Sequence, residues 1–414
     1  MALADRPSLL YIPAVRKRIG IGILSCTLFL AGCASSGKPS AQERADQLNE
    51  EKTRGAELVA NGEYQAAVDV LTPLSKTASG DAQVLLLLGE AHEGTGATAD
   101  AIRSYEQAIR LSYGMSQSHL RLATLLMREE KIGRALTEFQ LAIQYGEHSA
   151  LAHFNYGLAL HRMGRGTEAL EEWKRARDID RDDARFAEAV GIGLTAHDPQ
   201  EAIEAFRDAE SLGASGAVFA NNFGLALQAT GAFNEAERWF RLAVEEDPAG
   251  ESYRFNLAAL LTRRGDYDVA AAEWEDMLRA FGEHWSYRVY LARCRIEKRR
   301  FDEALAAVEK IAVDFDSGAI RRSDEVIDRL PPGLDEALEI IALAWRGKGS
   351  DARALGLIRR AVELAPESAS HLNNYGVILA ENGMLDEAKA QWRKVLEIDP
   401  ENATARENLS AFRR

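Results

Sequence analysis

The chain has 414 residues, of which 46% are hydrophobic and 28% charged, and its formal net charge is −14. This composition excludes an intrinsically disordered chain, and 32 glycines with 10 prolines exclude a collagen-like one. The acidic balance argues against nucleic acid as a partner, because binding to phosphates requires clustered lysine and arginine. We therefore expect a globular or repeat protein.

The amino terminus has the regions of a bacterial export signal. Arg16-Lys17-Arg18 forms a basic cluster, and residues 19–30 form an apolar run. Twelve residues span only about 18 Å as a helix, which is too short for a stable membrane anchor. We therefore predict a signal peptide over residues 1–32.

The end of the apolar run, Leu30-Ala31-Gly32-Cys33, resembles the lipobox of bacterial lipoproteins. The resemblance implies that diacylglycerol alkylates the Cys33 thiol and that the signal is cleaved just before this cysteine. An ordinary secretory signal with a chance cysteine is the alternative interpretation.

The residue after the cysteine, Ala34, is not aspartate, which resembles the outer-membrane sorting pattern of proteobacterial lipoproteins. We expect the mature protein to be lipid-anchored at the periplasmic face of the outer membrane. The lipidated cysteine and a short tether would occupy residues 33–47.

The rest of the chain repeats one small residue with a period of 33 or 34 residues and one longer interval. This residue stands at Gly55, Gly89, Ala123, Gly157, Gly191, Gly224, Ala258, Ala292, Ala342 and Gly376. An alanine follows each of them after 11 or 12 residues, at Ala67, Ala101, Ala135, Ala169, Ala202, Ala236, Ala270, Ala304, Ala354 and Ala388. A large apolar residue comes four residues later, at Leu71, Tyr105, Phe139, Trp173, Phe206, Phe240, Trp274, Val308, Ile358 and Trp392. Such a period indicates a repeat protein.

This pattern resembles the tetratricopeptide repeat (TPR), whose signature is nearly complete in Asn222-Phe223-Gly224, Gly231, Ala236 and Pro248. The resemblance implies an all-α TPR solenoid, a right-handed superhelix of about ten helix-turn-helix repeats, after the lipoprotein signal peptide. In each repeat, the small residues would let two antiparallel helices approach closely. Glycines with positive φ are expected in the turns, at Gly62, Gly96, Gly164, Gly231, Gly265 and Gly383.

One interval, from Ala292 to Ala342, is 16 residues too long. It predicts an inserted helix or loop that ends at Pro331-Pro332-Gly333. A binding role for this insertion and a neutral change in length are both open. The predicted organisation is repeats 1–8 over residues 48–314, the insertion over 315–334, repeats 9–10 over 335–402 and a capping helix over 403–414.

Catalytic and metal-binding motifs are missing from the sequence, so we expect no enzyme, no cofactor and no metal site. His119 and His153 both take the fourth position of a repeat, where a packed side chain is expected. Cys294 lies between Arg293 and Arg295, which favours a lowered thiol pKa. An enzyme that uses Cys294 is the less favoured alternative, because no histidine signal lies near this cysteine and a structural thiol explains it better.

Asparagine recurs at position six of the first helix, counted so that the small residue is eighth. The predicted partner-binding groove comprises Asn155, Asn222, Asn256 and Asn374, the preceding Asn221 and Asn373, and the apolar Phe154, Phe255, Leu158 and Leu225. In the resembled family the first helices line the concave side, so these amides would face water and bind an extended peptide. A purely structural role for the asparagines is the alternative. Leu120 and Thr124 do not fit the carboxylate clamp of some family members.

The whole chain resembles TPR lipoproteins that assist the assembly of envelope machines, such as the pilotins of type IV pili and the lipoprotein of the tight-adherence (Flp) pilus. The resemblance implies a non-enzymatic scaffold whose partners are envelope proteins of a pilus, secretion or polysaccharide-export system. A scaffold for exopolysaccharide export or for cell-wall hydrolases is the alternative in the same class.

Overall fold

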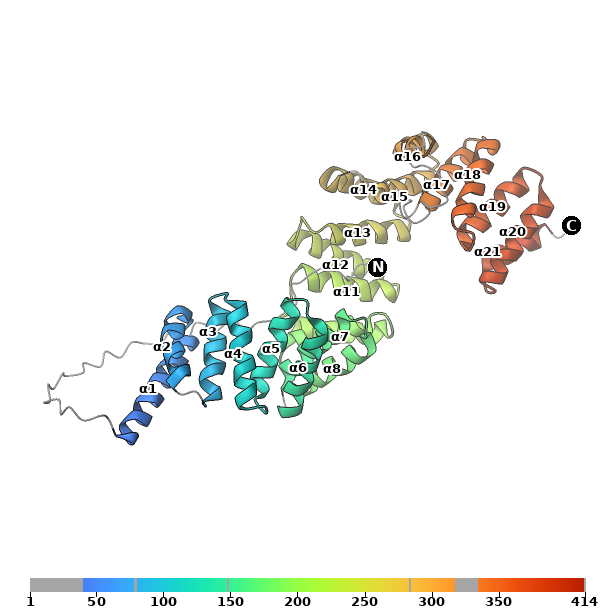
Figure 1. Ribbon diagram of the computed structural model, residues 1–414. Helices are drawn as coiled ribbons and strands as arrows, with labels where there is room; N and C mark the ends of the chain where they lie inside the picture. Colours follow the sequence, from blue (N-terminus) through green and yellow to red (C-terminus); the bar gives the residue numbers. More distant parts are fainter. Residues whose placement is uncertain (1–39, 78–79, 147–148, 283, 317–333, 413–414) are drawn as a thin grey trace. The chain divides into compact units, whose positions relative to one another are not determined.

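The computed structural model describes residues 40–412, except residues 78–79, 147–148, 283 and 317–333 (Figure 1). These residues form 21 α-helices and no strand, which confirms the all-α TPR solenoid. None of these helices is long and apolar enough to cross a bilayer. The predicted signal peptide, the lipobox with Cys33 and the helix expected within the insertion lie outside the described residues.

The described residues divide into two compact units, one that ends at Ala214 and one that begins at Ser215. The helices of the first unit form five antiparallel pairs, one pair per repeat. They are α1 (Ala41–Ala60), α2 (Tyr64–Thr77), α3 (Ala82–Gly94), α4 (Thr98–Leu111), α5 (Ser116–Arg128), α6 (Ile132–Tyr145), α7 (Ala150–Arg162), α8 (Gly166–Ile179), α9 (Ala184–Leu194) and α10 (Pro199–Ser211).

The second unit has five further pairs and a final single helix. They are α11 (Ala217–Ala229), α12 (Phe233–Glu246), α13 (Glu251–Arg264), α14 (Tyr267–Phe281), α15 (Trp285–Glu297), α16 (Phe301–Asp316), α17 (Leu334–Gly347), α18 (Asp351–Leu364), α19 (Ala369–Glu381), α20 (Leu385–Ile398) and α21 (Ala403–Ala411). Helix α21 packs on α20 and on α19, so it covers the apolar face of the last repeat. Helices α16 and α17, which flank the insertion, pack directly on each other.

The first helix begins at Ala41, inside the segment 33–47 that the sequence analysis assigned to the tether. A capping box explains this difference. The Ser40 side chain accepts a hydrogen bond from the Glu43 amide, and the Glu43 carboxylate accepts one from the Ser40 amide. These bonds satisfy two amides that a helix start leaves unpaired, so the helix extends toward the amino terminus.

The short turns inside the repeats need a left-handed residue. The six glycines expected there have φ angles between 74° and 93°. Two repeats place Glu130 (φ 57°) and Arg299 (φ 56°) in this conformation instead. A side chain is less stable there than glycine, so the turns of repeats three and eight carry some backbone strain.

Inside each repeat, the recurring small residue makes room for the large side chain of the second helix. A Cβ atom added to Gly224 would lie 2.7 Å from Phe240 Cδ1, and one added to Gly376 would lie 2.7 Å from Trp392 Cε2. All ten recurring alanines are fully buried, and the ten large residues are at most 1% exposed. Two of the large residues also bond to the backbone of the first helix, because Trp173 Nε1 and Trp392 Nε1 each donate to a carbonyl oxygen 3.2 Å away.

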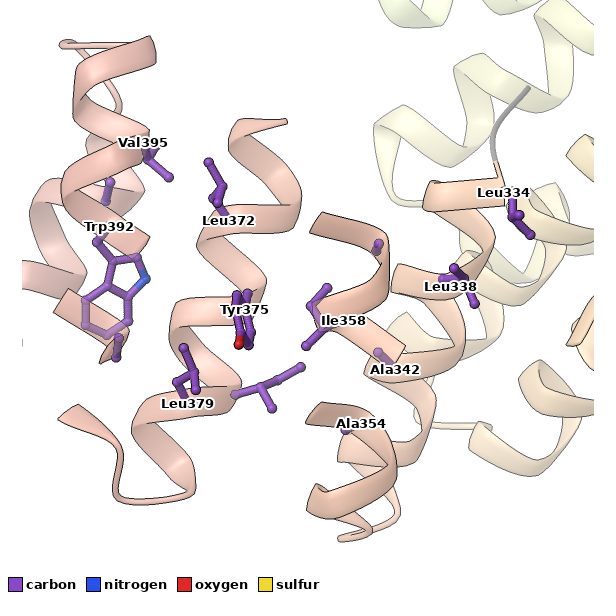
Figure 2. Packing of buried hydrophobic residues seen from close by; sticks show 14 residues of the cluster. Leu334, Leu338, Ala342, Ala354, Ile358, Leu372, Tyr375, Leu379, Trp392 and Val395 are labelled. Atoms are coloured by element: carbon purple, nitrogen blue, oxygen red, sulfur yellow. The ribbon is translucent and has the colours of Figure 1, made fainter. Parts of the chain in front are cut away.

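The same contact is visible in repeat nine, where the small residue is alanine. Ile358 lies between the helix that carries Ala342 and the helix that carries Tyr375, with Ala354 one turn away (Figure 2). The large side chain therefore fills the crossing inside its own repeat and also touches the next repeat. We call this pairing of the small residue with the large one the small–large contact.

First helices of successive repeats lie closer together than second helices do. Contacts join α1 to α3 and α5 to α7 in the first unit, and α11, α13, α15, α17 and α19 in series in the second. The described second helices make no comparable contacts with one another. The more tightly packed layer must lie on the inside of the curve of each unit, so the first helices form an inner wall.

The small–large contact predicts that a glycine-to-leucine substitution lowers the free energy of unfolding at Gly224 and does not lower it at Gly356. Gly224→Leu would force side-chain atoms into Phe240 and should lower the free energy of unfolding by about 1–3 kcal/mol. Gly356→Leu is the control, because a Cβ atom there meets nothing within 4 Å and leucine favours helix. Urea denaturation checks both variants, and a Gly224→Leu chain as stable as the control would contradict the packing described here.

Candidate partner-binding wall

The inner wall holds the asparagines that the sequence analysis assigned to a groove, but most of them are buried. Asn155 is 1% exposed, Asn222 is 7% exposed and Asn221 is 9% exposed. Asn256, Asn373 and Asn374 are half-buried. The expectation that these amides face water is therefore wrong for the first three residues.

The reason is that position six faces the first helix of the preceding repeat. Asn256 Nδ2 donates to Asn221 Oδ1 over 2.6 Å, and Asn374 Nδ2 donates to Glu339 Oε1 over 2.7 Å. Both partners stand 35 residues earlier in the chain, at position five of the repeat before. The amides thus join successive first helices, as the structural alternative predicted.

Asn155 also takes position six, but it lacks the polar partner that Asn256 and Asn374 have in the preceding repeat. The residue 35 positions earlier is Leu120, which has no polar atom in its side chain. The Asn155 Oδ1 atom is buried without a hydrogen-bond partner among the described residues. At the end of the chain, Asn373 Nδ2 donates to Asn402 Oδ1 over 3.2 Å, which fixes α21 on the last repeat.

The predicted apolar residues of the wall differ in accessibility. Phe154 is only 3% exposed, because its ring packs 5.2 Å from that of Phe186. It is therefore part of the core and not a surface for a partner. Phe255, Leu158 and Leu225 are half-buried, so each keeps part of its apolar surface open to solvent.

The histidines at position four are packed, as expected, and each bonds to a carboxylate of its own repeat. His119 Nδ1 lies 2.7 Å from Glu138 Oε2, and His119 Nε2 lies 2.8 Å from the Tyr113 carbonyl oxygen. His153 Nδ1 lies 2.6 Å from Glu172 Oε2. These contacts connect the first helix of a repeat to the second helix or to the turn before it.

Repeats nine and ten are joined by a buried polar cluster around Glu339, whose side chain is 2% exposed. Glu339 Oε1 accepts from Ser370 Oγ at 2.9 Å and from Asn374 Nδ2 at 2.7 Å. His371 Nδ1 lies 3.1 Å from the same oxygen, and His371 Nε2 lies 2.9 Å from Asp335 Oδ2. Two carboxylates therefore face one imidazole.

The cluster shifts both pKa values toward the charged forms. Burial favours neutral His371, but the hydrogen bonds and charges of Glu339 and Asp335 outweigh it and raise the pKa of His371. Burial also favours neutral Glu339, but hydrogen bonds from His371, Asn374 and Ser370 lower its pKa. A buried ion pair thus connects α17 and α19.

Cys294 does not have the environment of a nucleophile. The side chain is fully buried, and its sulfur lies 3.6 Å from Thr262 Oγ1. Burial raises the pKa of the thiol more than the Thr262 hydroxyl and the Arg293 charge lower it. The enzyme alternative based on Cys294 therefore gains no support. The described part of the chain also contains no group of three metal-ligating side chains.

Sequence reasoning missed two residues of the inner wall in repeat eight. Tyr290 takes position six of α15, where the other repeats suggested asparagine, and Arg293 takes position nine. Both side chains are half-buried. The same counting from Ala292 that located the asparagines would have found them.

Sequence models of the tetratricopeptide repeat match most of this chain, over residues 53–114, 120–184, 217–245, 255–320 and 346–403. The chain belongs to the tetratricopeptide repeat family. Proteins of this family generally mediate protein–protein interactions, typically without enzymatic activity. No curated protein sequence matches the chain.

Several solved structures resemble parts of the chain. YrrB, described as "a TPR protein with an unusual peptide-binding site", is 17% identical, with a TM-score of 0.39 over 43% of this chain and 92% of that one. MamA is 20% identical, with a TM-score of 0.37 over 41% of this chain and 92% of that one. MamA from Desulfovibrio magneticus RS-1 is 18% identical, with a TM-score of 0.37 over 40% and 95%. The family assignment rests on the repeat sequences and not on these likenesses.

The ion pair of His371 predicts a pH-dependent stability. Because the folded pKa is raised above 6.5, the stabilisation is complete below pH 6.5 and is lost as the pH rises through the folded value. The advantage of the wild type over His371→Gln in urea denaturation should therefore shrink between pH 6 and pH 9.

The control for this measurement is His197→Gln, which replaces an exposed histidine of the first unit. Its stability should follow that of the wild type at every pH. A difference between the wild type and His371→Gln that stays constant from pH 6 to pH 9 would contradict the charged state of the cluster.

Proposed function

We propose that this protein is a periplasmic scaffold, anchored to the outer membrane through a lipid on Cys33, that binds segments of envelope proteins along its inner walls. Assistance in the assembly of a pilus or secretion complex is the task we infer from the sequence resemblance. Membership of the tetratricopeptide repeat family supports the interaction role, and the lipobox-like Leu30-Ala31-Gly32-Cys33 supports the anchor.

The observation that carries the interaction role is the state of the inner wall in the second unit. Within the second unit, position nine of the described first helices takes no part in side-chain bonds between repeats, and Leu225 there remains half-buried. Asn256 is also half-buried. Its Nδ2 atom donates to Asn221, and its side-chain Oδ1 atom accepts no hydrogen bond from any described residue. An apolar group and a hydrogen-bonding group thus stand on the first helices of two successive repeats, which suits an extended peptide.

The anchor is tested by Cys33→Ser. This variant should lose its lipid and appear as uncleaved precursor or soluble material, because only a thiol can take the diacylglycerol at that site. Cys26→Ser is the matched control, since it removes a thiol of the predicted signal peptide and should leave lipidation intact. Membrane fractionation and the mass of the amino-terminal peptide check both, and a lipidated Cys33→Ser protein would show that the anchor lies elsewhere.

The interaction role is tested by cross-linking in the native host. A photo-reactive phenylalanine analogue at Leu225 should capture an envelope protein, because that side chain stands on the inner wall. The same analogue at Arg238, an exposed residue of the second helix α12, should capture much less. Equal capture from the two sites would remove the inner wall as the binding surface.

A further inference from the structure

In the second unit, a half-buried cation of the inner wall has no carboxylate partner among the described residues. Arg293 stands at position nine of α15, and its guanidinium makes no ion pair or hydrogen bond with any described residue. The guanidinium carbon lies 6.0 Å from the centroid of the Tyr290 ring. Glu297, one turn further along α15, is not within ion-pair distance.

Two other half-buried arginines of the first helices are neutralised. Arg121 pairs with Glu90 at 3.3 Å, and Arg346 pairs with Glu381 at 2.6 Å. In a chain whose net charge is −14, an unpaired guanidinium among half-buried side chains therefore stands out. It can form strong, bidentate hydrogen bonds with a carboxylate from outside the chain.

A second cation, Arg263, is carried by the neighbouring first helix α13. Thr262 of α13 approaches Cys294 of α15, with Oγ1 and Sγ 3.6 Å apart. Arg263 and Arg293 are the direct neighbours of these two residues, so both guanidinium groups are attached beside the same helix contact. Arg263 is exposed and also makes no ion pair in the described part of the chain.

An aromatic platform adjoins the cations. The Tyr290 ring stacks on Trp274 with centroids 4.7 Å apart and an interplanar angle of 10°. Phe255 meets the edge of Tyr290 at 5.7 Å. Trp274 is fully buried whereas Tyr290 and Phe255 are half-buried, so the core holds the platform rigidly while one side stays open. Rigid aromatic surfaces bind apolar side chains at a low cost in conformational entropy.

We propose that the inner wall of repeats seven and eight selects a partner segment in which an aspartate or glutamate stands beside an apolar residue. The carboxylate pairs with Arg293 and Arg263, and the apolar side chain lies on Tyr290 and Phe255. The amide of Asn256, one helix away from Tyr290, accepts from the backbone of the segment. This inference rests on the proposed function, because it names the chemistry that the inner wall recognises.

The overall charge of the chain makes the proposal specific. A net charge of −14 repels acidic segments at a distance, so nothing but a local cationic site favours their binding. Recognition should therefore depend on these two arginines and should weaken when salt screens their charge.

The experiment selects phage-displayed dodecamer peptides on the mature chain, purified in detergent with its anchor. Each selected peptide is then synthesised in two forms, one as selected and one with every aspartate and glutamate changed to the corresponding amide. The acidic form should bind roughly tenfold or more tightly, as measured by fluorescence anisotropy, because a carboxylate–guanidinium bond is lost in the other.

Variants of the protein test whether the preference for acidic peptides comes from the inner wall. Arg293→Gln should remove most of the difference between the two peptide forms, and Arg293→Lys should keep part of it. Arg238→Gln, which removes an exposed charge from the second helix α12, should bind like the wild type. The helical circular dichroism of each variant confirms that it folds.

Two other results would separate a failure of the acidic preference from a failure of the proposed function. Peptides that bind equally well in acidic and amide forms, and lose binding in Leu225→Glu, would overturn the acidic preference and keep the inner wall as the binding surface. A selection without binders, or with binders that neither Arg293→Gln nor Leu225→Glu weakens, would overturn the proposed function as well.

Discussion

The fold depends on one contact that is made ten times, between a glycine or alanine on the first helix of a repeat and a large apolar side chain on the second. The small residue removes the Cβ or γ atoms that would hold the two backbones apart, and the large side chain fills the space. In every repeat, dispersion attraction and the burial of apolar surface are therefore concentrated where the two helices cross. A fully buried alanine lies beside this crossing.

This crossing also determines how the repeats are joined and which positions of the first helices stay accessible to a partner. Once the large side chains are enclosed, first helices approach one another and form the inner wall, with polar bonds from position six to position five of the repeat before. Position nine and the rings at positions five and six are then the parts of the wall that a partner can reach. The buried charges of Glu339 and His371 serve the junction of repeats, whereas Arg293 is left without a partner of its own.

Much of this architecture was predictable from the sequence because the small–large contact has a fixed spacing. The ten buried alanines and the six turn glycines with positive φ occupy positions that the period identified. The start of α1 could also have been predicted from the sequence, because Ser40 and Glu43 form the signature of a capping box. The burial of Asn155 was not, because it depends on how far each first helix turns toward its neighbour. For the same reason Phe154 is core while Phe255, at the equivalent position, is half-buried.

The central claim is that stability is built from contacts within a repeat and between neighbours, and it is tested most directly by hydrogen exchange after Ala236→Leu. Ala236 is fully buried at the crossing of α11 and α12, so leucine would overpack one repeat. The account predicts that amide protection falls most in α11–α13, less in α14 and α15, and not at all in α18–α20. A uniform loss of protection from α11 to α20 would contradict it.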